Sequence, residues 1–340
     1  MTMEYKLFGK TGIKVSELCL GTMTFGRHTP REDAFSIMDR FAEQGGNFMD
    51  TANVYNSGVS EEILGEWLKG QQRDDFFIAT KVRFPMGQSP NAAGLTRNHI
   101  LQSVRDSLKR LGTEYIDLLQ VHAWDPLTPV RDTMRVLNNL VESGLVRYIG
   151  ASNFRAWQLA LSIHESRIGG LEEFTSLQPQ YNLLTRATEF ELMPLCISEN
   201  IAVIPWSPLK GGLLTGKYNR GKTGSTDETR IWENVKKGRG APWEKNEDYV
   251  WAVVDALKKV SGETGKTPSQ VALNWVMSKK GVTSPIIGVR NISQLEDNLG
   301  ATGWKLSGEH MGILDEASQL FVSYPYDEAS EEQQQSGRIN

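Results

Sequence analysis

Four side chains that can exchange protons stand at or just beyond the ends of apolar runs that predict buried β-strands. They are the carboxylate of Asp50, the phenol of Tyr55, the ammonium of Lys81 and the imidazole of His122. The runs are NFMDT (47–51), FFIATKV (76–82) and YIDLLQVH (115–122). Helical stretches separate the runs, so the strands should be parallel, and parallel barrel strands converge at their C-terminal ends. Gathered on that face, the four groups would form a proton-delivery site, which predicts an enzyme.

Tyr55 is the predicted proton donor. A free phenol has a pKa near ~10 and is too weak an acid to protonate a carbonyl readily at neutral pH. Lys81 would lower that pKa by favouring the phenolate, and Asp50 would hold the charge on the lysine. His122 can orient a carbonyl oxygen or relay a proton. Singly, these residues could be a helix cap, a partly buried aromatic and a satisfied core histidine, but their co-location favours catalysis.

Eight apolar runs in all alternate with amphipathic helical stretches. The remaining five are LCLGT (18–22), VRYIGASN (146–153), FTSLQ (174–178), IAVIPW (201–206) and SPIIG (284–288). Eight strand–helix units predict an α/β fold, a closed (β/α)8 TIM barrel rather than an open doubly wound sheet. One domain over residues 1–324 is expected, with a β-hairpin at residues 5–18 ahead of the barrel.

Helix boundaries are marked in the sequence at two places. Thr96 precedes an apolar-spaced helix that should end near residues 111–112. Thr267 and Pro268, followed by Gln270, form a capping box with proline at the first helical position. Both signals support the alternation of strands with helices.

Two segments depart from the alternation. Residues 207–265, between the seventh and eighth strands, open with the Gly-rich, basic stretch KGGLLTGKYNRGKTG. They predict a long loop insert on the catalytic face, where such loops contact substrate or cofactor. Residues 325–340 are polar and acidic with few apolar anchors, which predicts a mobile tail.

The composition of the 340 residues is that of a soluble globular protein, with 39% hydrophobic and 23% charged residues. A net charge of −4 provides no electrostatic footprint for nucleic acid or an anionic membrane. Cys19 and Cys196 lie in apolar contexts and are expected to be buried thiols, which suits a reducing compartment. Without an apolar signal core or a membrane-length run, a cytoplasmic location is expected, and a monomer is the simplest oligomeric state.

The four proton-exchanging groups, in their sequence contexts, resemble the aldo-keto reductase family. The matching stretches are DTANVYNSGVSEEILGEWL (50–68), IATKV (78–82), DLLQVHAWDP (117–126) and VRYIGASNF (146–154). The resemblance extends from about Tyr5 to about Ala317. Asn56 stands where the family commonly has glycine, and residues 123–124 where a basic or polar residue often follows the histidine, so both departures concern specificity.

The resemblance implies reversible hydride transfer between a nicotinamide cofactor and a carbonyl group, with Tyr55 giving the proton. Asp50, Lys81 and His122 complete the implied catalytic set. The cofactor carries the hydride, and the protein positions and polarises the substrate. No metal is required, and the sequence holds no Cys/His cluster that could bind one.

The resemblance also implies how the cofactor is held. The sequence has no G-x-G-x-x-G fingerprint, which agrees with a barrel that binds its cofactor differently from an open sheet. The cofactor-binding residues implied are Ser152, Asn153, Gln178, Trp206, Ser207, Leu209, Gly211, Lys217, Gly288, Arg290, Gln294, Asp297 and Asn298. Trp206 would stack on the nicotinamide ring. Arg290 can bind a 2′-phosphate, which favours NADPH over NADH, although an exposed solubilising charge is the alternative.

Substrate identity is less determined. Residues expected to line the substrate site are Met23, Phe25, Arg83 and Trp124. Arg83, with Arg27 or Lys210, could attract an acidic or sugar-derived aldehyde, but the residues alone favour the alternative that these three are ordinary surface charges. An alternative to an enzyme is a cofactor-binding, redox-sensing accessory protein, because potassium-channel β-subunits share this fold and similar motifs, including a stretch like residues 206–209.

Overall fold

Eight parallel strands form the central sheet of the structure, a computed structural model that describes residues 3–220 and 246–336. The strands are β3 (Cys19–Gly21), β4 (Phe48–Asp50), β5 (Phe77–Val82), β6 (Ile116–Val121), β7 (Val146–Ser152), β8 (Ser176–Gln178), β9 (Ala202–Val203) and β10 (Ile286–Gly288). Each lies inside one of the eight predicted runs. Their spatial order is β10-β3-β4-β5-β6-β7-β8-β9, which is chain order with the last strand returning beside the first.

Backbone hydrogen bonds between the last two strand segments close the sheet into a barrel. The Thr283 amide donates to the Val203 carbonyl at 2.8 Å, and the Ile286 amide donates to the Pro205 carbonyl at 2.8 Å. Val203 and Val282 also form a parallel bridge. The predicted (β/α)8 barrel is therefore confirmed.

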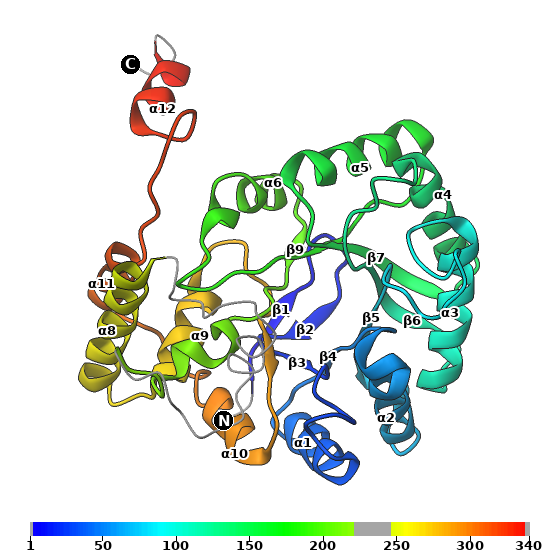
Figure 1. Cartoon of the computed structure of the whole chain (residues 1–340), viewed down its shortest axis with the longest axis horizontal. Helices are drawn as coiled ribbons and strands as arrows, with labels where there is room; N and C mark the ends of the chain where they lie inside the picture. Colours follow the sequence, from blue (N-terminus) through cyan, green and yellow to red (C-terminus); the bar gives the residue numbers. More distant parts are fainter. Residues whose placement is uncertain (1–2, 221–245, 337–340) are drawn as a thin grey trace.

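Helices surround the strands on the outside (Figure 1). They are α1 (Arg31–Glu43), α2 (Val59–Leu68), α3 (Arg97–Leu111), α4 (Val130–Glu142), α5 (Ala156–Gly169), α6 (Leu192–Ser198), α8 (Glu247–Thr264), α9 (Pro268–Ser278), α10 (Ile292–Leu299), α11 (Gly308–Ala317) and α12 (Glu328–Gln335). Short 3-10 turns are η1 (Tyr55–Gly58), η2 (Arg73–Asp75), η3 (Ala187–Glu189) and η4 (Lys210–Thr215). No helix of the described residues is long and apolar enough to cross a membrane.

The helix boundaries marked in the sequence are confirmed. Thr96 caps α3 by accepting from the His99 amide, and Gly112 ends this helix in the left-handed conformation with φ of 61°. Thr267 and Gln270 form the capping box of α9, with Pro268 at its start.

A hairpin closes the N-terminal end of the barrel, as predicted. Strands β1 (Tyr5–Leu7) and β2 (Lys14–Ser16) pair antiparallel. Phe8, in the connecting turn, is fully buried, with its ring centroid 5.8 Å from that of Phe48 and 5.0 Å from that of Phe77. Cys19 belongs to the same cluster and is a buried free thiol, as is Cys196 elsewhere in the core. This aromatic plug leaves the opposite, C-terminal end of the strands for a site.

The segment 207–265 is not one long loop, which corrects the sequence prediction. Residues 247–264 form α8, which packs on α9 and α11. Its buried residues include Val250, Val253, Val254 and Leu257, an i, i+3, i+4, i+7 pattern that predicts a helix. Residues 221–245 of the expected insert lie outside the described residues, so its role stays a prediction.

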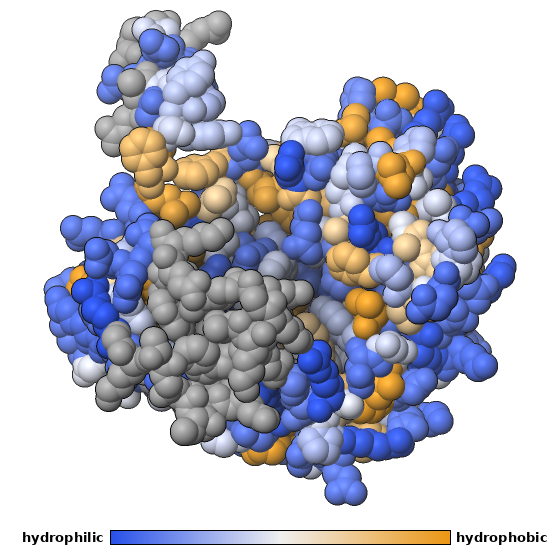
Figure 2. All heavy atoms as spheres, in the orientation of Figure 1, coloured by the Kyte–Doolittle hydropathy of each residue, from blue (hydrophilic) through white to orange (hydrophobic). Residues whose placement is uncertain are grey.

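The C-terminal segment contains a helix, α12, that stands away from the barrel (Figure 1). It is preceded by Tyr326, whose ring stacks on Phe190 with centroids 5.2 Å apart and whose hydroxyl donates to Glu191 at 2.7 Å. Mobility of this segment and a domain boundary at residue 324 stay predictions. In the same orientation, the surface is mostly hydrophilic, with hydrophobic residues in smaller groups (Figure 2).

Candidate active site

Alternation along the strands separates an apolar lower layer of the barrel interior from a polar layer above it. Phe77, Ala79 and Lys81 are alternate residues of β5; the first two belong to the apolar cluster at the hairpin end, and the third lies nearer the C-terminal end. Lys81 is in register with Gln120 on β6, and Gln120 is in register with Gly150 on β7. The residues that the strands contribute to the polar layer are thus positioned by strand register.

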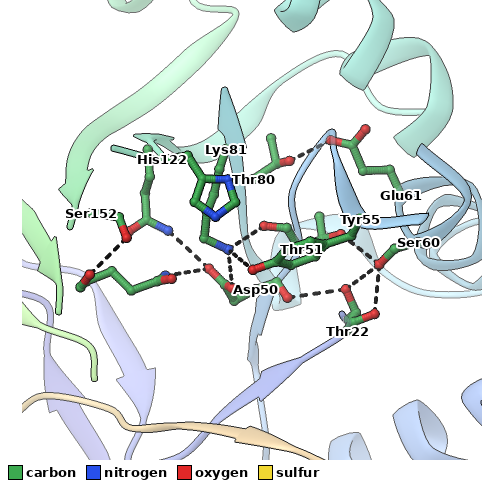
Figure 3. Close-up of polar contacts among 12 residues, drawn as sticks. Thr22, Asp50, Thr51, Tyr55, Ser60, Glu61, Thr80, Lys81, His122 and Ser152 are labelled. Atoms are coloured by element: carbon green, nitrogen blue, oxygen red, sulfur yellow. Dashed lines mark hydrogen bonds and ion pairs between the residues drawn. The ribbon is translucent and has the colours of Figure 1, made fainter. Parts of the chain in front are cut away.

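Lys81 is fully buried and is the centre of the polar layer (Figure 3). Its Nζ donates to Asp50 Oδ1, to the Thr51 carbonyl at 2.7 Å and to Tyr55 Oη at 3.2 Å. Burial acts to lower the pKa of Lys81, but the charge of Asp50 and the oxygen of Tyr55 outweigh it, so the pKa lies above its ordinary value. The buried ammonium therefore keeps its proton at neutral pH.

Tyr55 is aimed at Lys81 by an unusual backbone turn. It begins η1, in which Asn56 and Ser57 have positive φ values of 49° and 56°. Asn56 tolerates the left-handed conformation that usually favours glycine, and its Nδ2 also donates to the Gly26 carbonyl at 2.9 Å. Asn56, which stands where the family commonly has glycine, is therefore compatible with the turn that positions Tyr55.

Hydroxyl groups support the loop between β4 and α2 from below. Ser60 Oγ lies 2.7 Å from Thr22 Oγ1 and 2.9 Å from Thr51 Oγ1 (Figure 3). Beside them, Thr80 Oγ1 donates to the buried Glu61 at 2.5 Å. These contacts tie the start of α2 to strands β3 and β5, which fixes the backbone on both sides of Tyr55.

His122 follows β6 and faces the same group of residues. Its ring centroid lies 5.8 Å from that of Tyr55 and 4.7 Å from that of Phe84. Burial, reinforced by the positive charges of Lys81 and Arg83, lowers the pKa of His122 to about 3. The imidazole is therefore neutral at physiological pH, and its buried Nδ1 has no hydrogen-bond partner within the described protein.

Two amides hold the second oxygen of Asp50. Asp50 Oδ2 accepts from Gln178 Nε2 at 2.8 Å and from Gln120 Nε2 at 3.1 Å. Sequence reasoning included Gln178 but missed Gln120. The signal was available, because Gln120 lies two residues before His122 on a strand and must share its face.

A cavity of about 710 Å³ opens above this layer. Asp50, Tyr55 and His122 line it, while Lys81 lies behind them. All thirteen residues implied for the cofactor line it as well. The sequence did not single out Gly21, Thr24, Pro208, Gly212, Thr215, Ser269, Ile286 and Ile287, which also contribute to its walls.

One end of the cavity carries linked amide and hydroxyl groups. Asn153 Nδ2 donates to the His122 carbonyl at 2.9 Å and to Ser152 Oγ at 3.1 Å. Trp206 Nε1 donates to Asn153 Oδ1 at 3.1 Å, and Ser152 Oγ donates to the Gln178 carbonyl at 2.9 Å. The indole ring and the side chains of Asn153 and Ser152 are thus held in one network beside the proton-exchanging groups.

The other end of the cavity is formed by η4 and the start of α10. Gly211 and Gly212 have positive φ values of 65° and 97°, and a Cβ on Gly212 would lie 3.4 Å from Lys217 Nζ. Across from this turn, the Arg290 amide donates to Gln294 Oε1 at 2.9 Å. Asp297 accepts from Thr267 and Gln270 at 2.7 and 3.3 Å, so its carboxylate is held by α9.

The four residues expected around the substrate are placed differently from one another. Met23 lines the cavity. Phe25 is fully buried in the hydrophobic core and does not line the cavity, because the turn after β3 packs against α2, where Gly26 lies beside Val59 and Ile63. Arg83 and Trp124 are outside the cavity lining, and Trp124 packs against Phe154 and Trp157 with ring centroids 5.3 and 5.6 Å away.

Comparison with known proteins agrees with this geometry. The pattern of the aldo/keto reductase family matches residues 17–319. An uncharacterized oxidoreductase, YrpG, from Bacillus subtilis is 37% identical over 92% of this chain and 95% of its own. A probable voltage-gated potassium channel subunit beta from Arabidopsis thaliana is 37% identical over 88% and 91%, and a norsolorinic acid reductase from Aspergillus flavus is 32% identical over 98% and 86%. With the barrel, the cavity at its C-terminal end and these similarities together, the chain belongs to the aldo/keto reductase family.

Proposed function

We propose that this chain is an NADPH-dependent reductase that converts the carbonyl group of an aldehyde or ketone into an alcohol. One observation carries the proposal: a single buried ammonium, Lys81, contacts both Asp50 and Tyr55 beside a cavity of about 710 Å³. A phenol, a cation and a carboxylate in this order suit delivery of a proton to an oxygen. Relatives that carry oxidoreductase names support the general activity.

The walls of the cavity fit a nicotinamide cofactor, which would supply the hydride when bound. Ser152, Asn153 and Gln178 offer the donors and acceptors that pair with a carboxamide, and the indole of Trp206 offers a flat face. At the other end, Lys217 and Arg290 bring positive charge to the two sides of the cavity. The guanidinium of Arg290 would bind a 2′-phosphate, which is the reason for preferring NADPH to NADH.

The residues of this chain would then have different roles in the reaction at the carbonyl oxygen. Tyr55 Oη donates its proton to that oxygen, and the ammonium of Lys81, 3.2 Å away, stabilises the phenolate that remains. Asp50 balances the charge of the buried lysine. His122, neutral because its pKa is about 3, donates a hydrogen bond that orients the oxygen, and it does not act as an acid.

We propose a sugar-derived or acidic aldehyde as substrate. The support is electrostatic, because Arg83 lies close enough to His122 to help lower its pKa and would attract an anion to that side. Lys210 does not share this role, since its Nζ donates to Thr185 Oγ1 at 2.7 Å outside the cavity lining. Equal kcat/KM values for neutral and carboxylated aldehydes of the same size would contradict the acidic substrate.

The function is tested with purified protein by following NADPH oxidation with neutral, aromatic and acidic aldehydes, and with NADH in parallel. Turnover of at least one aldehyde by wild type, lost in Tyr55→Phe, is the expected result. Size-exclusion chromatography of the same sample tests the expected monomer. Absence of turnover across the panel, together with tight NADPH retention, would argue against a reductase.

A second candidate function is a cofactor-binding regulatory role. It is favoured by the similarity to a probable potassium channel subunit beta over 88% of the chain. The two candidates differ in what they require, because a reductase turns over without a partner whereas an accessory protein acts through one. The turnover assay therefore separates them.

A further inference from the structure

Asp50 is held by more donors than an ion pair with Lys81 requires. Its Oδ1 accepts from Lys81, and its Oδ2 accepts from Gln178 at 2.8 Å and from Gln120 at 3.1 Å. All four side chains are buried, with at most 2% of any residue exposed. A buried carboxylate is strongly stabilised by each charge-assisted hydrogen bond, so the number of donors matters here.

The two amides differ in what else they can reach. Gln178 lines the cavity, whereas Gln120 lies in the barrel interior outside the lining. The Gln120 side chain donates from its Nε2 to Asp50, and the Gln120 Oε1 has no hydrogen-bond partner among the described residues. Gln178 can therefore exchange Asp50 for a ligand in the cavity, while Gln120 cannot.

Strand register and a glycine give Gln120 its place. Gln120 is in register with Lys81 on one side and with Gly150 on the other. A Cβ on Gly150 would lie 3.3 Å from Gln120 Cγ and 2.2 Å from Ser176 Oγ. The missing side chain on β7 thus leaves room for the amide to lie across the barrel toward Asp50.

We propose that Gln120 is a positioning residue of the proton-delivery site, which keeps Asp50 hydrogen-bonded when Gln178 turns to the carboxamide of a bound cofactor. The inference rests on the proposed function for its cofactor part. The two glutamines then have separate roles. Gln178 donates either to Asp50 or to the cofactor. Gln120 stays hydrogen-bonded to Asp50 and so lowers the free-energy cost of moving Gln178 to the cofactor.

The first experiment needs no activity and uses thermal unfolding of the full chain. Gln120→Met keeps the length and volume of the side chain but removes the amide, and it should lower Tm by about 3 °C. In an Asp50→Asn background, the same substitution should lower Tm by less than half as much, because the charge-assisted bond is already gone. Equal shifts in both backgrounds would show that Gln120 acts by packing alone and would overturn the proposal.

The second experiment separates the nicotinamide end of the cofactor from its adenosine end. In Gln120→Met, Gln178 is the remaining amide that donates to Asp50 Oδ2. Its release to the cofactor would therefore leave that oxygen without a charge-assisted hydrogen bond. The Kd of NADP⁺ should therefore rise about tenfold. The Kd of adenosine 2′,5′-bisphosphate, which lacks nicotinamide, should change less than about twofold. An equal increase for both ligands would contradict the shared role of Gln178.

The third experiment uses Gln120→Glu and pH. The titratable groups around Asp50 are Lys81 from β5, Tyr55 from η1, His122 from β6 and Cys19 from β3. The carboxyl group introduced by Gln120→Glu would have a raised pKa, because Asp50 beside it is negatively charged. In its protonated form this group could still donate a hydrogen bond to Asp50. Its stabilising contribution is present at low pH and is lost as pH rises, so Tm of Gln120→Glu relative to Gln120→Met should fall between pH 5 and 8. A constant difference would count against the contact with Asp50.

A control is available on β8, the strand beyond β7. Ser176 is fully buried in the barrel near Gly150, but its Oγ has no hydrogen-bond partner within the described residues. Ser176→Ala should leave the NADP⁺ Kd unchanged. If wild type itself fails to bind NADP⁺, the proposed function fails, and the Tm experiments still decide whether Gln120 holds Asp50.

Discussion

Lys81 Nζ lies 3.2 Å from Tyr55 Oη and 4.8 Å from the centroid of the same ring. The lysine comes from the interior face of β5, and the tyrosine comes from the turn after β4. Because β4 and β5 are adjacent and parallel, the end of one strand lies beside the end of the other. This contact places a fixed positive charge where a phenolate would form.

Replacement of Tyr55 by phenylalanine removes the proposed proton donor and leaves the ring. The kcat for carbonyl reduction should fall by about 10²- to 10⁴-fold, while the Kd of NADPH stays within about twofold. Tyr148→Phe, on β7 and outside the cavity lining, is the matched control and should retain kcat. Steady-state kinetics and fluorescence titration provide the two measurements. A Tyr55→Phe enzyme with wild-type kcat would remove tyrosine from this role.

Arg290→Ala tests recognition of the 2′-phosphate. A charge-assisted pair of this kind contributes about 1.5–3 kcal/mol, so the KM for NADPH should rise by about 10- to 100-fold. The KM for NADH should change much less, because NADH carries no 2′-phosphate. Lys280→Ala, a charge removal at an exposed site, should alter neither value. Equal effects of Arg290→Ala on both cofactors would assign the arginine another function.

His122 should make the folded state sensitive to acid. Its pKa is about 3 in the fold and near 6.5 when unfolded, so the folded state binds fewer protons between these values. The contribution of neutral His122 to the free energy of unfolding is complete above pH 6.5. It is lost as pH falls, by up to about 1.4 kcal/mol per pH unit. His122→Gln should make the free energy of unfolding less dependent on pH between 6.5 and 4, as measured by urea titration.

The control for the acid measurement is His164→Gln, since His164 is exposed on α5. It should keep the wild-type dependence on pH. The buried His99, whose pKa is also lowered by burial, contributes part of the remaining slope in all three proteins. An identical slope in wild type and His122→Gln would mean that His122 titrates as an ordinary exposed histidine.

The buried pair of Glu61 and Arg110 joins α2 to α3 beneath the Tyr55 turn. Glu61 is fully buried and accepts from Arg110 Nε at 2.7 Å and from Thr80. Arg110→Met would leave the carboxylate without its positive partner and should reduce the free energy of unfolding by about 3–5 kcal/mol. Arg105→Met, exposed on the same helix, should change it by less than about 0.5 kcal/mol. Chemical denaturation measures both, and similar small losses would show that the pair contributes little.

Local signals in the sequence predicted most of the fold. Apolar runs located all eight strands, and the caps at Thr96 and Thr267 located two helix starts to the residue. The helix α8 was missed because the glycines and basic residues that precede it suggested a loop throughout residues 207–265. Its own pattern, with Val250, Val253, Val254 and Leu257 on one face, was the better indicator.

The site was predicted unevenly for a physical reason. Residues such as Asp50 and Lys81 were identified because they are polar groups at the ends of apolar strands and match family motifs. Phe25 was misjudged because its place after a strand says nothing about whether the turn folds toward the cavity or into the core, where it lies. Gln120 was overlooked because it belongs to no motif that carries chemistry, although its position two residues before His122 puts both residues on one face of the strand.

The sequence by itself determined the number and order of the strands, the side chains that each strand carries at its end, and the alternation that puts Lys81 and Gln120 inside the barrel. These properties depend on residues near one another in the chain. Only the tertiary structure decided that Gln120 and Gln178 reach one oxygen of Asp50, from 70 and 128 residues away. That convergence depends on strand register and barrel closure, which bring distant residues together and which no local pattern encodes.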